Sequence, residues 1–182
     1  RLVGISVGAQ RNGGNLVAGL ADRLLQQPRR VGATIAGQPG HLDEITVGGV
    51  PAFEPHREDV ARREVAAALR DAFLVGAEAS IRLGVVLGQR HYDHGFHQTA
   101  TAGRFGASVA AGRLLDLGPQ RLRMALSLAS TRASGLKAQF GTMGKPYNAG
   151  IAAANGVEAA LLAERGFISC DDGLGAAQGF LA

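Results

Sequence analysis

The sequence predicts an all-α protein, a compact helical bundle with short glycine-rich connections. Apolar residues recur at steps of three and four over long segments, and no alternation of strands with helices is found. Glycine accounts for 27 of the 182 residues and alanine crowds the second half, so helices can approach one another closely. The chain is expected to form a single helical domain over 1–182, with an irregular N-terminal part at 1–57 and a helical core at 58–182.

The longest predicted helix begins at Glu58-Asp59, whose acidic side chains suit the first turn, and ends by Gly88. Its apolar residues recur with the helical period, which predicts a central and substantially buried helix. These residues are Val60, Val65, Leu69, Phe73, Leu74, Ala77, Ile81 and Val85.

Three further helices are predicted after it. The first follows a loop that carries His97 and begins near Ala102, with Thr99 and Thr101 as candidate N-caps. The second has Pro119 at its first position and Gly135 as its C-cap. The third runs from Pro146 to Arg165 and is closed by Gly166.

Composition narrows the classes of function. The net charge is +4 and the isoelectric point is near 10, but the chain has 5% aromatic residues, no tryptophan and no basic–aromatic interleaving. This pattern disfavours nucleic acid and favours small anionic metabolites. No apolar run is long enough to span a membrane, and no signal peptide is recognised at the start. A single cysteine, Cys170, fits a reducing cytoplasm, which is the expected location.

Two stretches predict anion sites at helix N-termini. His97 precedes one predicted helix, where free N–H groups and the helix dipole favour a carboxylate. Lys145 stands at the start of another, behind a glycine-flexed loop that carries Thr142, so a cation, a hydroxyl and free backbone N–H groups are expected to converge there. A lysine there opposes the helix dipole, which singles it out. On these residues alone, His97 could equally be a hydrogen-bonded core histidine.

The spacing of His91, His94 and His97 raises a second hypothesis, a zinc hydrolase. The known helical zinc signature places two histidines four residues apart with a glutamate, and this spacing differs. Gly95 argues against one helix through all three, and no further histidine or cysteine ligand is found downstream at a suitable spacing. We therefore assign no metal ligand.

Several motifs resemble the MmgE/PrpD family, from about Ala72 to the C-terminus. They are Gly95-Phe96-His97-Gln98-Thr99-Ala100-Thr101, Gly141-Thr142-Met143-Gly144-Lys145-Pro146 with Ala149-Gly150, Ala152-Ala153-Ala154-Asn155-Gly156-Val157, and Arg165-Gly166-Phe167. The resemblance implies the helical domain of that fold without its lid domain. It also implies a homodimer, no cofactor, and a metal-independent site for di- or tricarboxylates.

The resemblance assigns roles to particular residues. His97 and Lys145 match the family's active-site histidine and lysine, and Thr99 and Thr142 beside them are expected to bind substrate. His41-Leu42-Asp43 resembles the start of a further family segment, with Asp43 and Thr46 as substrate-binding residues. That segment is shortened here, and Pro55-His56 reverses the usual His-Pro order.

These observations lead to a functional hypothesis with open alternatives. The first is a lyase similar to 2-methylcitrate dehydratase, in which His97 transfers a proton and Lys145 stabilises the developing negative charge. Activity like that of cis-aconitate decarboxylase or iminodisuccinate epimerase would use the same two residues and a similar carbanion-like or enediolate-like intermediate. A non-catalytic module for carboxylate binding or dimerisation is the remaining alternative.

Overall fold

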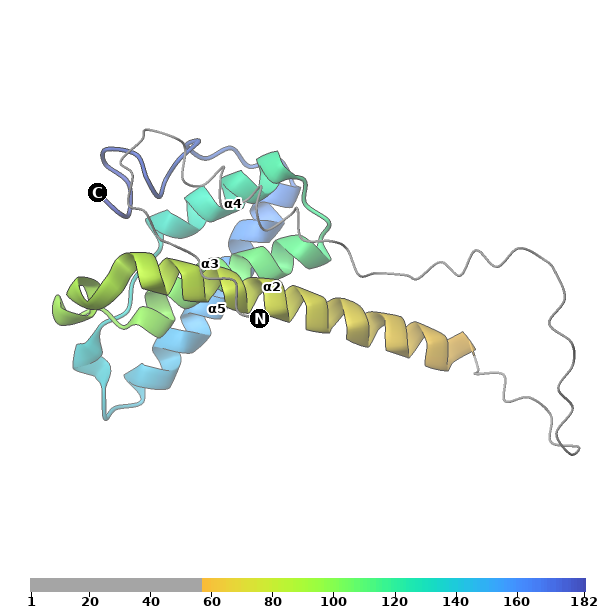
Figure 1. Ribbon diagram of the computed structural model, residues 1–182, viewed down its shortest axis with the longest axis horizontal. Helices are drawn as coiled ribbons and strands as arrows, with labels where there is room; N and C mark the ends of the chain where they lie inside the picture. Colours follow the sequence, from red (N-terminus) through yellow and green to blue (C-terminus); the bar gives the residue numbers. More distant parts are fainter. Residues whose placement is uncertain (1–56) are drawn as a thin grey trace, which may run out of the picture.

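The computed structural model describes residues 57–182, and all regular elements in that range are helical. In chain order they are α2 (Arg57–Asp93), α3 (Gln98–Leu114), α4 (Pro119–Thr131), the 3-10 helix η1 (Lys137–Gln139) and α5 (Gly144–Glu164). The only extended pairing in this range is one antiparallel bridge between Phe96 and Leu136. The predicted all-α class is confirmed for the described residues (Figure 1).

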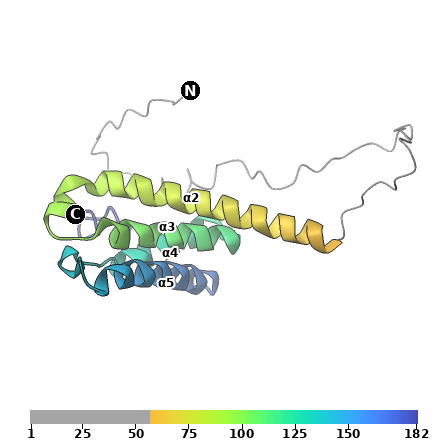
Figure 2. The same cartoon turned by 90° about the horizontal axis from the view of Figure 1, so that it is seen from below.

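Helix α2 packs against α3 through small residues, and α3 packs in turn against α5, so the three helices form successive layers (Figure 2). A Cβ atom added at Gly76 of α2 would lie 2.6 Å from the Gly106 carbonyl oxygen of α3. The two backbones are therefore in direct contact, and only small side chains fit between them.

This close approach overturns the prediction that the large apolar residues of α2 are buried. The side chains that α2 buries are those of Ala72, Ala79 and Leu83, at 1%, 0% and 3% exposure. Six side chains of the predicted stripe lie on the outside instead, with exposures of 53–69%. They are Val65, Leu69, Phe73, Leu74, Ile81 and Val85. The N-terminal half of α2 also extends past the end of α3 (Figure 2).

Helix α2 does not end at Gly88 as predicted, but changes direction there. Gly88 has φ 61° and ψ −168°, a conformation that glycine adopts without a steric penalty, and the helix continues to Asp93. The Gln98 side-chain amide donates to the Gly88 carbonyl at 2.9 Å, so the break is tied to the start of α3. The break thereby places His91 beside α3.

The other helix boundaries fall close to their predicted positions, with three corrections. Helix α3 begins at Gln98 with His97 as its N-cap, so Thr99 and Thr101 are first-turn residues and not caps. Pro119 begins α4 as predicted, but α4 ends at Thr131 with Arg132 as its C-cap. Gly135, with φ 131°, lies in the connector that follows.

Helix α5 starts at Gly144, two residues before the predicted Pro146, and its C-cap is Arg165. Gly166 has φ 86°, and the Phe167 amide donates to the Leu162 carbonyl at 3.0 Å, so the helix closes as predicted.

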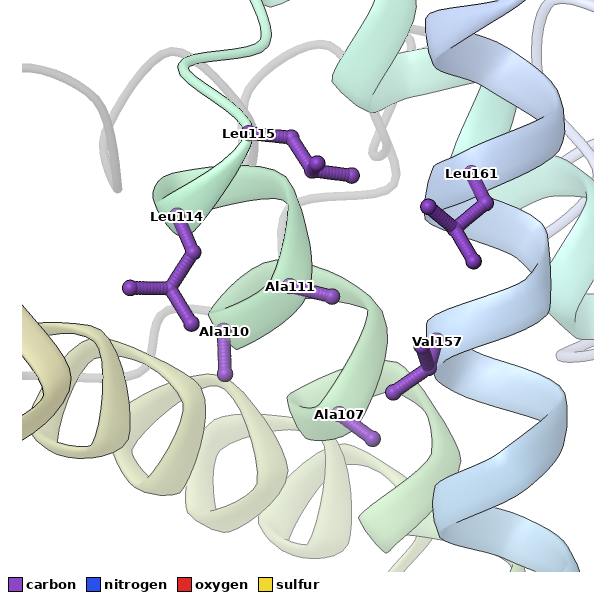
Figure 3. A pocket seen from close by; sticks show the side chains of 7 residues that line it. All are labelled: Ala107, Ala110, Ala111, Leu114, Leu115, Val157 and Leu161. Carbon is purple, nitrogen blue, oxygen red and sulfur yellow. The ribbon is translucent and has the colours of Figure 1, made fainter.

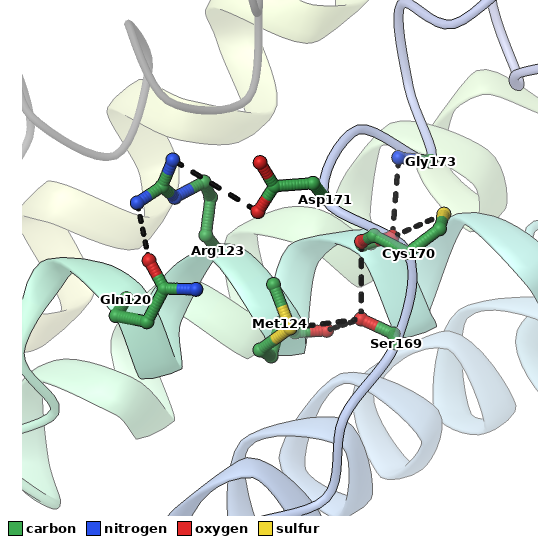
Figure 4. Close-up of polar contacts among 8 residues, drawn as sticks. Gln120, Arg123, Met124, Ser169, Cys170, Asp171 and Gly173 are labelled. Carbon is green, nitrogen blue, oxygen red and sulfur yellow. Dashed lines mark hydrogen bonds and ion pairs between the residues drawn. The ribbon is translucent and has the colours of Figure 1, made fainter.

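The hydrophobic core lies between α3, α4 and α5 and is covered by the C-terminal segment. Its largest fully buried apolar side chains are Phe105, Val109, Leu122, Leu126 and Leu174. The segment is fixed to α4 by hydrogen bonds from the Ser169 hydroxyl to the Met124 carbonyl at 2.8 Å and from the Gly173 amide to Ser127 Oγ at 3.1 Å (Figure 4). None of the described helices combines the length and apolar character needed to cross a membrane.

Candidate active site

The backbone of His97 is held between the ends of two helices. The His97 amide donates to the Gly135 carbonyl at 2.9 Å, and the Lys137 amide donates to the Gly95 carbonyl at 2.8 Å. These bonds flank the bridge between Phe96 and Leu136, so the connector from α4 to α5 is joined to the loop before α3. The His97 carbonyl accepts from the amides of Ala100 and Thr101 and begins α3.

The His97 side chain is buried against an aromatic ring. It is 8% exposed, and its ring meets Phe140 edge-on, with centroids 5.1 Å apart and an interplanar angle of 85°. Its Nδ1 atom is buried without a hydrogen-bond partner among the described residues. Burial lowers the pKa of His97 below its usual 6.5, and the charge of Lys145 lowers it further. The imidazole is therefore neutral near pH 7 and able to accept a proton.

Lys145 is the second residue of α5, which confirms its predicted place at a helix N-terminus. Its Nζ atom lies 5.1 Å from the centroid of the Phe140 ring. Because Phe140 contacts both side chains and the charge of Lys145 acts on His97, the structure brings these two residues into one site. Lys145 is exposed where His97 is buried, so the cation faces the solvent side of the pair.

Thr142 is bonded within its own loop. Its Oγ1 donates to the Gln139 carbonyl at 2.8 Å and accepts from the Gly144 amide at 3.1 Å. The amides of Lys145 and Tyr147 donate to the carbonyls of Thr142 and Met143, and Pro146 has no amide hydrogen. The predicted cluster of free N–H groups at the start of α5 is therefore wrong, and Lys145 supplies the positive charge there through its side chain.

The remaining predicted substrate-binding residues have different outcomes. Thr99 is an exposed residue in the first turn of α3, two positions after His97. Asp43 and Thr46 lie outside the described residues, so their predicted roles stay predictions.

The structure does not bring His91, His94 and His97 together as metal ligands. His91 Nε2 shares a hydrogen bond with Thr101 Oγ1 at 2.9 Å, and His94 Nδ1 donates to the Arg90 carbonyl at 2.6 Å. Among residues 57–182, no group of three or more histidine, cysteine, aspartate or glutamate side chains could hold a metal ion.

The sequence reasoning missed two contributors to the site. Phe140, in the connector between the two predicted motifs, is the ring that His97 and Lys145 both contact. His91 stacks on Phe96 with centroids 4.6 Å apart and bonds Thr101, so it contacts both sides of the His97 turn. Neither contact has a sequence signal of its own, because each depends on how the connector and the end of α2 fold back.

The geometry defines a class: an all-α domain with a buried neutral histidine beside an exposed lysine, suited to proton transfer on an anionic compound. Residues 37–182 match the MmgE/PrpD N-terminal domain, and the chain belongs to the MmgE/PrpD family.

Named relatives agree with this assignment. The chain is 39% identical over 98 residues to cis-aconitate decarboxylase of Aspergillus terreus, which covers 53% of this chain and 20% of that protein. It is 38% identical over 71 residues to cis-aconitate decarboxylase of Homo sapiens, which covers 39% of this chain and 15% of that protein. A cis-aconitate decarboxylase-like protein of Aspergillus oryzae is 35% identical over 99 residues. The matched part spans about a fifth of the length of the Aspergillus relatives.

Proposed function

We propose that this chain carries the proton-transfer half of a lyase site for a di- or tricarboxylate. The observation that carries the proposal is the pair formed by His97 and Lys145, which both contact Phe140, with the pKa of His97 lowered by burial and by that lysine. The relatives named as cis-aconitate decarboxylases make cis-aconitate the first substrate to test. 2-Methylcitrate, a dehydration substrate, is the second.

The proposed chemistry gives His97 and Lys145 one role each. For dehydration, neutral His97 takes the proton from the carbon next to a carboxylate, and the electron pair forms the double bond. The hydroxyl group leaves as water, with a proton returned from the imidazolium directly or through solvent. For decarboxylation, the bond to the departing carboxylate breaks, carbon dioxide leaves, and the carbon that keeps the electron pair takes a proton from water, directly or through His97. In both cases Lys145 would pair with a remaining carboxylate and stabilise the negative charge of the transition state.

Groups outside this chain are expected to complete the site. Lys145 lies between Met143 and Tyr147 in the chain, and these two residues are 90% and 67% exposed, so large apolar side chains near the lysine are exposed on this side of the protein. We propose that further parts of the polypeptide, corresponding to the family's lid domain, cover this side. Turnover is therefore best measured in the longest polypeptide that contains this chain, and binding can be measured in both.

Isothermal titration calorimetry tests the proposal. Cis-aconitate, 2-methylcitrate, citrate and a monocarboxylate are titrated into the native chain, Lys145→Ala and Arg121→Ala, an exposed arginine of α4 that serves as a charge-matched control. Loss of a charge-assisted bond worth about 1.5–3 kcal/mol predicts at least tenfold weaker tricarboxylate binding in Lys145→Ala alone. Equal weakening in both variants would mean non-specific charge attraction. Binding without turnover in the longer polypeptide would favour the non-catalytic carboxylate-binding module.

We also propose that the protein is a homodimer, supported by its uncovered apolar surfaces. The outer stripe of α2 includes Val65, Leu69 and Phe73, and an apolar groove of about 410 Å³ lies between α3 and α5 (Figure 3). Apolar patches of this kind mark association surfaces. Sedimentation equilibrium is expected to show a dimer for the native chain and a shift to monomer for Leu69→Ser/Phe73→Ser. A monomeric native chain at all accessible concentrations would refute the dimer.

A further inference from the structure

Arg104 is a buried cation that the proposed reaction does not use. It lies in the middle of α3, two turns after His97, and its side chain is 0% exposed. Its Nε, Nη1 and Nη2 atoms are all buried without a hydrogen-bond partner among the described residues. A buried guanidinium is stable only when an acceptor compensates for its lost hydration. The described part of the protein supplies none.

A second orphaned polar group follows one turn later on the same face of α3. Ser108 is four residues after Arg104, also 0% exposed, and its Oγ has no partner among the described residues. Side chains four apart on a helix are neighbours. Two residues one turn apart on α3, Arg104 and Ser108, thus have buried donors without an acceptor. This points to a missing acceptor rather than to one misplaced side chain.

At the level of Arg104 and Ser108, the backbone of α3 faces a glycine of α5. Gly156 of α5 faces this part of α3, and a Cβ atom added there would lie 2.4 Å from the Arg104 carbonyl oxygen and 2.8 Å from the Ser108 amide nitrogen. The backbones of α3 and α5 therefore meet at this level, and the facing residue has no side chain.

A nearby positive charge makes the buried guanidinium of Arg104 still less favourable without an acceptor. Burial lowers the pKa of Arg104, and the positive charge of Arg132 lowers it further. Arg132 caps α4 and pairs with Glu158 of α5 at the surface. The carboxylate of Glu158 is thus already engaged by the second arginine.

We propose that Arg104 and Ser108 form a binding site for one small carboxylate, separate from the site of His97 and Lys145. The planar fork of a guanidinium matches the two oxygens of a carboxylate, and the Ser108 hydroxyl adds a third donor. Because both side chains are fully enclosed, the ligand is a group of few atoms. Formate in solution and an aspartate or glutamate side chain from outside residues 57–182 both provide this chemistry.

Thermal unfolding in formate tests the proposal. Sodium formate replaces sodium gluconate, whose anion is too bulky for an enclosed site, at constant ionic strength. The melting temperature of the native chain is expected to rise with formate and to follow a binding curve. Arg104→Met, which keeps an unbranched side chain without the charge, is expected to show no such rise. Arg113→Met, in the last turn of the same helix, is the control and should respond like the native chain.

Further variants make the result specific. Ser108→Ala removes one donor and should weaken the apparent formate affinity by about three- to tenfold, as expected for one hydrogen bond. Arg104→Lys keeps the charge but not the fork and should weaken it as well. Circular dichroism verifies that each variant is helical before its response is compared.

The two sources of the carboxylate give different results. If the 182-residue chain ignores formate but Arg104→Met destabilises a longer polypeptide, the carboxylate comes from the protein itself, and the site is supported. If the native chain ignores formate and Arg104→Met is more stable than the native protein in every salt and in both lengths, Arg104 has no anionic partner. That result overturns the proposal.

Discussion

Replacing Gly156 with alanine tests whether close backbone contact between α3 and α5 holds the site together. Helix α5 carries Lys145 and α3 is capped by His97, so the spacing of the two helices sets the spacing of the two side chains of the proposed site. A Cβ atom at position 156 would lie 2.4 Å from the Arg104 carbonyl oxygen and 2.6 Å from the Ala107 Cβ atom. The helices would have to move apart by about 1 Å to restore ordinary van der Waals distances.

The expected loss of stability is the difference of two opposing effects. Overpacking a close-packed interface costs about 1–3 kcal/mol, and the upper end applies because the added methyl group meets backbone atoms, which cannot rotate away. Alanine is favoured over glycine inside a helix by about 1 kcal/mol. We therefore expect Gly156→Ala to lower the free energy of unfolding by about 2 kcal/mol.

Gly150 of the same helix provides the matched control. It is exposed, and a Cβ atom there meets nothing within 4 Å, so Gly150→Ala should gain about 1 kcal/mol from helix propensity alone. Urea denaturation followed by circular dichroism at 222 nm measures both variants, with the slope of the transition compared to verify that the unfolded states match. If Gly156→Ala proves as stable as Gly150→Ala, the backbones are not in contact and the reasoning is refuted.

Three further predictions follow from the contacts near the site. NMR titration should give His97 a pKa below 6.5, and Lys145→Met should raise it without restoring 6.5, because burial is the larger cause; a native value at 6.5 or above would contradict this. Since His97 binds its second proton less readily in the folded chain than in the unfolded chain, the free energy of unfolding should fall as pH drops from 6.5 toward the lowered pKa. His97→Gln should reduce this dependence of stability on pH, and an unchanged dependence would mean that other groups cause it. Lys137 Nζ lies 3.5 Å from the centroid of the Tyr92 ring and donates to the Tyr92 carbonyl at 2.9 Å. Lys137→Met should therefore lower the free energy of unfolding, measured in urea, by about 1–2 kcal/mol, and Lys137→Arg should lower it little.

The helices themselves were largely predictable from local signals. Pro119 at the start of α4 and Gly166 after α5 act through their own backbone conformations, and these signals need no tertiary contact. The burial of α2 was not predictable in this way. Its large apolar residues have the helical period of a core face, but the contact between Gly76 and Gly106 turns the small face inward. Periodicity identifies a helix, and the fit between two helices decides which face is buried.

Some features of the candidate site were likewise predictable from local sequence, and others depended on the tertiary structure. The sequence by itself determined that His97 precedes a helix and that Lys145 stands at the start of another, because N-terminal signals are local, and its motifs indicated the MmgE/PrpD family. The structure moved the first of these helix starts from near Ala102 to Gln98. Only the tertiary structure decided that Phe140 contacts both residues. It also showed that Thr142 and the first amides of α5 form hydrogen bonds within their own loop and helix. Finally, it showed that Arg104 and Ser108 are buried without acceptors among the described residues. For the contact of Phe140 with His97 and for the burial of Arg104 and Ser108, the physical reason is distance along the chain, because segments dozens of residues apart pack together there and no local pattern encodes the partner of a buried group. The bonds of Thr142 join residues two or three positions apart, and they depend on the conformation of the loop.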